Sequence, residues 1–204
     1  MIKVCNMEVL LLGRFISIIF ILAGLGLLLY GGNELLQSYI SETKRLEEAK
    51  AFVSEETKTI DEVRDYEYNF EHGETIGMLY IPRLDRELPI IEGTEPDDLE
   101  EGVGHYIDTG YPGQNRQILL SGHRDTVFRN FGELEPGDEF HMKMEHGTFV
   151  YEFVDNEIVS ADDTTVIDFE RQDEYLTIST CYPFSYVGSA PDRYVIYAYP
   201  KVEK

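Results

Sequence analysis

The chain is predicted to be a mainly β protein: a closed or nearly closed β-barrel with short helices, preceded by an N-terminal transmembrane helix. Two observations predict this: an unbroken apolar run near the N-terminus, and many short strand-like runs between turn residues after residue 72. Short strands at close spacing, with only brief helical pieces between them, are typical of barrels. The 204 residues leave room for one core of ordinary domain size in addition to the apolar segment.

The apolar run extends from Phe15 to Tyr30, and Gly31-Gly32 prolong it. As a helix, residues 15–32 would be about 27 Å long, which is enough to cross the hydrocarbon core of a bilayer. A cleaved signal peptide is the alternative. The small residues that mark a cleavage site form a poor pattern here, so an uncleaved anchor is the prediction.

The charges around the run predict its orientation. Lys3 and Arg14 precede the run, and Glu34 follows it. The positive-inside rule then predicts a cytoplasmic segment 1–14, a single-pass anchor in the cell membrane, and an extracellular C-terminal domain. The net charge of −22 argues against a nucleic-acid partner, because two polyanions repel each other.

The next segment, residues 33–74, is highly charged, lacks proline and carries scattered apolar residues. Charges at helical spacing, such as Glu47 with Lys50, favour an exposed helix running to about Glu71. We therefore expect a charged, helical stalk, with a largely disordered stalk as the alternative. The barrel domain would then occupy residues 75–204.

Within this domain, runs of β-branched and aromatic residues bounded by glycine, proline or acidic residues predict the strands. In chain order they are Ile76–Pro82, Glu87–Gly93, Ile118–Gly122, Glu139–Met144, Thr148–Val159, Tyr175–Cys181 and Arg193–Tyr199. A short acidic helix is expected from Asp97 to Val103, and a helical turn that ends before Pro136 is expected from Thr126 to Leu134.

Three reactive side chains lie at the ends of predicted strands. The run that ends at Cys181 alternates apolar and hydroxyl residues, and Pro183 stops it, so the thiol lies at the rim of the sheet. His123 follows one apolar run, and Arg193 opens another. Each has an ordinary alternative: a buried structural cysteine, a surface histidine, and an arginine in a salt bridge. Their combination predicts one active site.

A thiol, an imidazole and a guanidinium together can perform acyl transfer. The thiolate is the nucleophile, the imidazole exchanges the proton, and the guanidinium stabilises the oxyanion. The residue types leave open whether water or an amine completes the reaction. Cys5 lies before the predicted membrane segment, so no disulfide with Cys181 is expected.

The same segments resemble the motifs of the sortase family. Leu176–Cys181 is similar to the Thr-Leu-x-Thr-Cys signature, Gly122–Phe128 to the histidine motif, and Pro191–Tyr194 to the arginine strand. The resemblance covers about residues 75–202. The stretch from Cys181 to Tyr194 is most similar to class D sortases of Gram-positive bacteria.

The resemblance implies an eight-stranded sortase-type β-barrel and a membrane-anchored cysteine transpeptidase. Such an enzyme cuts surface proteins after Thr in a C-terminal LPxT-type sorting signal and passes the acyl group to an amine of a lipid-linked peptidoglycan precursor. It implies Cys181 as nucleophile, His123 as general acid or base, and Arg193 as oxyanion and substrate clamp. The further substrate-binding residues would be Thr180, Ser121 and Tyr182. No cofactor and no metal are expected.

Three alternatives remain. A pilin-polymerising sortase usually carries an Asp-Pro-aromatic lid, and none occurs between Glu34 and Glu71. A hydrolase of the same fold would pass the acyl group to water. A membrane-tethered binding module would keep the cysteine without activity, which the intact Cys, His and Arg set argues against. The segment 162–174 is expected to help select the signal, and His105 is expected to be a structurally satisfied residue.

Overall fold

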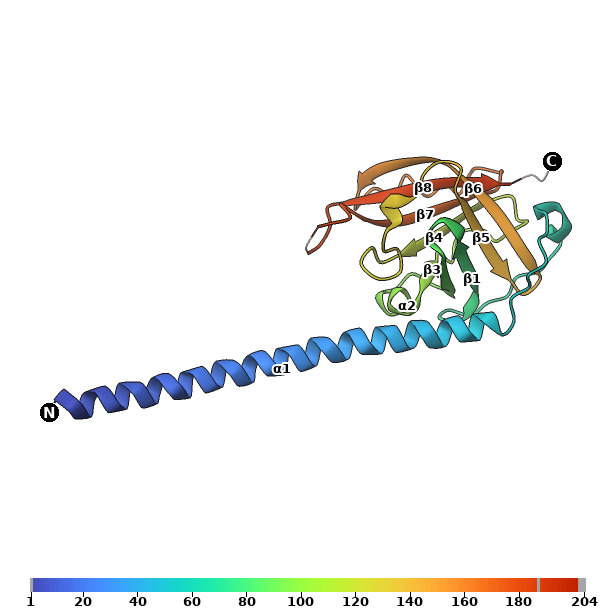
Figure 1. Cartoon of the computed structure of the whole chain (residues 1–204). Coiled ribbons are helices and arrows are strands. Elements are labelled where there is room, and N and C mark those ends of the chain that lie inside the picture. The colour runs from blue at the N-terminus through green and yellow to red at the C-terminus, as the bar shows by residue number, and fades with distance from the viewer. Residues whose placement is uncertain (1, 187, 202–204) are drawn as a thin grey trace. The chain divides into compact units, whose positions relative to one another are not determined.

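The computed structural model describes residues 2–186 and 188–201, with the side chains of residues 2–13 and 34 left aside. A long helix, α1 (Ile2–Lys50), precedes a closed barrel whose strands follow the order β1-β2-β3-β4-β7-β8-β6-β5 (Figure 1). The predicted fold class, an eight-stranded barrel after an N-terminal apolar helix, is confirmed.

Every predicted strand is present, and one further strand occurs. The strands are β1 (Thr75–Ile81), β2 (Arg86–Glu92), β3 (Val103–His105), β4 (Gln117–Gly122), β5 (Glu139–Met144), β6 (Gly147–Ser160), β7 (Tyr175–Tyr182) and β8 (Asp192–Pro200). The helical pieces between them are η2 (Pro82–Leu84), α2 (Pro96–Glu101) and η3 (Phe131–Glu133). The strand missing from the prediction is β3, whose three residues are too few to show an alternating pattern.

The side chains of β7 alternate between the interior and the outer face of the barrel. Leu176 and Ile178 are fully buried in the core, beside large aromatic residues from β5 and β6 such as Phe140 and Phe153. Successive residues of a strand point to opposite faces, so Thr180 shares the inward face of Leu176 and Ile178. Cys181 therefore belongs to the outer face of the barrel.

Strand pairing brings distant segments to one rim. β4 and β7 are parallel, and their register runs to the pair Gly122 and Thr180. Parallel strands end at the same edge, so the residues that follow this pair, His123 and Cys181, lie at the same rim of the sheet. β8 runs antiparallel on the other side of β7, where Arg193 is the partner of Cys181.

α1 is the one helix among the described residues that is long and apolar enough to cross a membrane, with a mean hydropathy of 2.3 over an 18-residue window. The chain divides into two compact units, one ending at Ile40 and one beginning at Ser41. The last turns of α1 belong to the second unit. There Arg45 pairs with Glu101 at 2.6 Å and Lys50 pairs with Glu87 at 2.9 Å.

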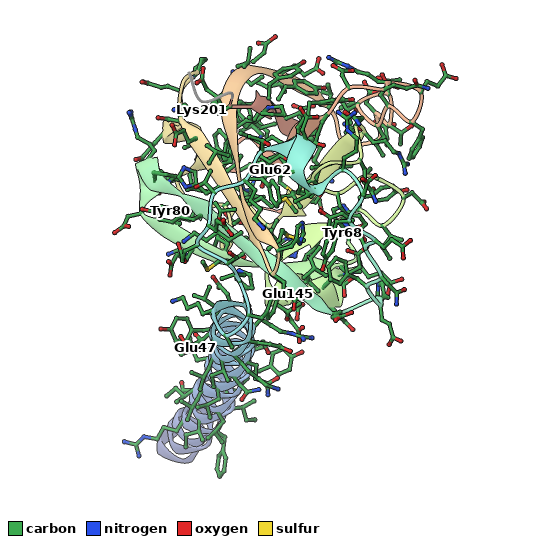
Figure 2. All side chains as sticks on the ribbon, turned by 90° about the vertical axis from the view of Figure 1, so that its right-hand side faces the viewer. Glu47, Glu62, Tyr68, Tyr80, Glu145 and Lys201 are labelled. Atoms are coloured by element: carbon green, nitrogen blue, oxygen red, sulfur yellow. The ribbon has the colours of Figure 1, made fainter. Side chains whose placement is uncertain are left out.

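The helix ends at Lys50, about twenty residues before the expected end at Glu71. Residues 51–74, which we call the linker, instead follow the barrel surface, as Figure 2 shows around Glu62. Apart from the 3₁₀ helix η1 (Ile60–Val63), they form no helix. The backbone of the linker bonds the β5–β6 hairpin: the amide of Ser54 donates to Met144 at 2.8 Å, and the amide of Thr148 donates to Glu56 at 2.7 Å. These tertiary hydrogen bonds override the local helical preference of a charged segment.

Aromatic residues hold the second half of the linker. Tyr66 stacks on His146 with a ring separation of 3.9 Å, and Tyr68 stacks on Tyr111 at 4.6 Å. The Tyr68 hydroxyl also donates to the carbonyl of Pro112 at 2.7 Å. The linker is thus bound to the barrel rather than extended from it.

This cluster predicts a pH dependence of stability. Burial, with a smaller contribution from the charge of Lys58, lowers the pKa of His146 from 6.5 to about 4. His146 therefore binds a proton more readily in the unfolded chain than in the folded one. The contribution of neutral His146 to the free energy of unfolding is complete above pH 6.5 and is lost as the pH falls towards 4. His146→Phe, which keeps the ring stacking but cannot titrate, is expected to lose less stability over this range than the wild type. Urea unfolding at several pH values measures the free energy of unfolding of both proteins. If this free energy changed with pH to the same extent in both, the prediction would be contradicted.

Candidate active site

Cys181, His123 and Arg193 line one cleft of about 390 Å³ at the rim of the barrel. They come from the ends of three strands that lie side by side: His123 follows β4, Cys181 lies near the end of β7, and Arg193 lies at the start of β8. The remaining wall is formed by two short segments, Arg124–Thr126 and Gly188–Ala190. The structure therefore brings together the three residues that the sequence singles out.

The thiol of Cys181 is free and half-buried, and the neighbouring His123 is exposed. A half-buried thiol is held in place by the strand while one side remains open to a substrate. The side chain of Cys5 lies outside the described residues, so the separation of the two cysteines stays a prediction.

Arg193 contacts the loop that precedes it. Its Nη1 donates to the carbonyls of Asp192 at 3.0 Å and Ala190 at 3.4 Å. Among the described residues no carboxylate lies within ion-pair distance of this guanidinium, and its Nε and Nη2 bond no described residue. A fixed guanidinium with free N–H groups can bind a carbonyl oxygen in the same cleft.

Arg124 is a part of the cleft to which the sequence analysis gave no role. It is only 7% exposed, and its Nε and Nη2 contact the two carboxylate oxygens of Asp125 at 3.2 and 3.1 Å. The hydrogen bonds that Arg124 donates to Asp125 are the main reason that the pKa of Arg124 is raised, and the nearby Cys181 adds a smaller electrostatic contribution. A permanent positive charge therefore lies near the thiol.

The three further residues expected to bind substrate have different positions. Thr180 is 2% exposed, and its hydroxyl donates to the carbonyl of Gly122 at 2.8 Å, so its side chain does not face the cleft. Tyr182 packs edge to face against Phe184 at 5.3 Å. Ser121 pairs with Ser179 on the outer face that carries Cys181. None of the three lines the cleft as far as the described residues show.

The hydroxyl of Thr180 thus has a structural partner, and a role of Thr180 in the substrate or oxyanion site stays a prediction. The reason for the structural contact is the strand period: a residue next to Cys181 on β7 must point to the opposite face. The hydroxyl holds the carbonyl of Gly122, the residue directly before His123.

His105 is a satisfied core residue, as expected. It is fully buried, and its Nδ1 lies 2.9 Å from a carboxylate oxygen of Glu92. Its Nε2 lies 3.0 Å from the carbonyl of Gly110. Both ring nitrogens thus have partners inside the fold, and neither is directed at the cleft.

Comparisons with known proteins agree with this geometry. The sortase domain family model matches residues 79–201. Over 191 residues, which cover 90% of this chain and 96% of the relative, the chain is 46% identical to Sortase D of Bacillus subtilis (strain 168). The Clostridium perfringens Sortase D5 transpeptidase has a TM-score of 0.64 and 29% identity, covering 79% of this chain and 99% of that chain. The catalytic domain of B. anthracis SrtD has a TM-score of 0.56 and 37% identity, covering 67% of this chain and 93% of that chain. The chain therefore belongs to the sortase family of cysteine transpeptidases, with class D members among its relatives.

Proposed function

We propose that this sortase is anchored in the cell membrane by residues 15–32 and joins surface proteins to the cell wall. It would cleave an LPxT-type sorting signal after Thr and transfer the protein to an amine of a lipid-linked peptidoglycan precursor. In this proposal Cys181 is the nucleophile, His123 the general acid and base, and Arg193 the oxyanion and substrate clamp. The observation that carries the proposal is the single cleft lined by these three side chains.

In the first half of the reaction, the Cys181 sulfur attacks the carbonyl carbon of the threonine. A C–S bond forms, and the carbonyl oxygen becomes an oxyanion beside Arg193, whose N–H groups stabilise the charge. The C–N bond then breaks, and the leaving amine takes a proton from His123. The product is a thioester with the N-terminal part of the substrate.

In the second half, the acceptor amine attacks the thioester carbon. The new C–N bond forms as the C–S bond breaks, and the proton of the amine passes to His123 while the Cys181 thiolate is restored. Both halves need the acyl carbon within reach of sulfur, imidazole and guanidinium at once. Placement of these groups on neighbouring strand ends supports that requirement.

The test uses the full chain in detergent with a labelled Leu-Pro-x-Thr peptide and a short peptide with a free α-amine. The proposal predicts a labelled amide product that contains the acceptor. Cleavage without the amide would instead favour a hydrolase, and the absence of both turnover and thioester would favour a binding module. A product formed only with a lysine side-chain amine of a second protein would favour a pilin polymerase.

The two cysteines test the orientation of the anchor, because they lie on opposite sides of residues 15–32. In intact cells, a maleimide that cannot cross membranes is expected to label Cys181 and not Cys5. Mass spectrometry of the labelled protein identifies the site, and a Cys5→Ser variant should be labelled to the same extent as the wild type. Labelling of Cys5 alone would show the reverse orientation.

A further inference from the structure

We infer that Arg124 is a positioning residue that holds the described part of the β7–β8 loop, residues 183–186 and 188–191, as one wall of the active cleft. The inference rests on the proposed roles of the cleft residues and adds a residue that acts on the loop rather than on the reacting atoms. The loop begins two residues after Cys181 and ends two residues before Arg193, so its conformation connects the two.

Two strong hydrogen bonds join Arg124 to the beginning of this loop. Its Nη1 donates to the carbonyl of Pro183 at 2.6 Å, and its Nη2 donates to the carbonyl of Tyr186 at 2.7 Å. The two carbonyls belong to one turn, since the amide of Tyr186 donates to the carbonyl of Pro183 at 3.2 Å. Hydrogen bonds from a charged donor are about twice as strong as neutral ones.

The opposite side of the guanidinium is fixed by Asp125. Nε and Nη2 contact the two carboxylate oxygens, and the side chain of Arg124 is 6% exposed while that of Asp125 is 73% exposed. A buried cation beside an open carboxylate depends on its remaining partners to replace the lost water. Those partners are the two loop carbonyls.

Within the described part of the loop, Phe184 packs against the core cluster and edge to face on Tyr194 at 5.2 Å, whereas the residues that follow it are more open. Residues 185, 186, 188 and 189 are exposed to solvent. The last two of these, together with Ala190, also line the cleft. The end of the loop is held by Arg193, which bonds the carbonyl of Ala190, and by the amide of Ala161, which donates to Pro191 at 2.9 Å. Arg124 and Arg193 thus hold the beginning and the end of the same wall.

Lysine could not replace Arg124 in this arrangement. The Nε, Nη1 and Nη2 of the guanidinium donate to Asp125, Pro183 and Tyr186 respectively, and Nη2 also contacts Asp125. An ammonium group has one nitrogen and no planar fork, so it would keep the charge but release at least one of the carbonyls. The inference therefore predicts that shape, and not charge alone, is required.

The experiment compares Arg124→Lys and Arg124→Gln with the wild type as full chains in detergent. Amide hydrogen exchange of residues 184–186 and 188–190 is expected to accelerate about tenfold or more in both variants, with the strand amides unchanged. The kcat/KM for the Leu-Pro-x-Thr peptide should fall about 10-fold to 100-fold, mainly through a higher KM, because the wall that receives the substrate is no longer fixed. Arg116→Gln is the matched control, since this exposed guanidinium also donates to a backbone carbonyl, that of Asp108 at 2.8 Å.

Two results would overturn the inference. One is an Arg124→Lys variant with wild-type loop exchange and wild-type kcat/KM. The other is a loss of protection throughout the barrel, or unfolding, in either variant, which would assign Arg124 to the stability of the fold. Cys181→Ala separates this inference from the proposed function: it should abolish turnover and leave loop exchange unchanged, so each idea fails on its own measurement.

Discussion

Cys181→Ala is expected to lower kcat for transpeptidation by at least about a thousandfold, the scale of loss when a covalent nucleophile is removed. Alanine removes the sulfur that would carry the acyl group, and no described residue of the cleft offers a second thiol. Because Cys181 is half-buried on the outer face and outside the packed core, the substitution should leave the barrel folded. The rate is measured by using chromatography to monitor the release of the labelled fragment.

Trapping the thioester gives the same prediction an independent readout. Intact-protein mass spectrometry should find the acyl adduct on the wild type and on Cys5→Ser, but not on Cys181→Ala. A Cys181→Ala variant that kept turnover, or an adduct on another residue, would refute the nucleophile assignment.

The second large effect is expected at Arg193. Arg193→Gln should lower kcat/KM about 100-fold to 1,000-fold, which is the usual loss when one oxyanion donor is removed. Arg193→Lys should regain less than a tenth of the kcat/KM that Arg193→Gln loses. The Nη1 of Arg193 already bonds the carbonyls of Ala190 and Asp192, so a lysine with one nitrogen cannot hold the loop and bind the substrate carbonyl together.

Arg83→Lys serves as the control for Arg193, because this exposed guanidinium pairs with Glu135 at 3.5 Å, away from the cleft. Its kcat/KM should match the wild type. Near wild-type activity in Arg193→Lys would show that charge alone is sufficient and that the fork geometry is not required.

The sequence predicted those parts of the fold whose signal is local. Alternation identified β7, and apolar runs identified β4 and α1, because strand period and hydropathy act over a few neighbouring residues. The linker was predicted wrongly as helix, since its hydrogen-bond partners, Met144 and Thr148, come about ninety residues later in the chain. A local pattern carries no information on such partners.

The same distinction applies to the site. Cys181, His123 and Arg193 could be predicted as site residues because each lies at the end of a strand that the sequence pattern predicts. Thr180 could have been assigned to the core from the alternation alone, since it shares the phase of Leu176 and Ile178. The role of Arg124 could not be predicted in this way. Its partners are the backbone carbonyls of Pro183 and Tyr186, and every residue has a carbonyl, so the sequence does not indicate which ones it contacts.

The outward direction of Cys181 has a consequence for the size of the molecules that this enzyme can process. The interior of the barrel is filled by side chains such as Phe140 and Phe153, so no polypeptide passes through it. A chain that reaches the thiol must instead lie across the outside of the barrel, with both of its ends free to continue into solvent. A folded domain upstream of the cleaved bond therefore never has to enter the enzyme, and turnover should be independent of how large that cargo is.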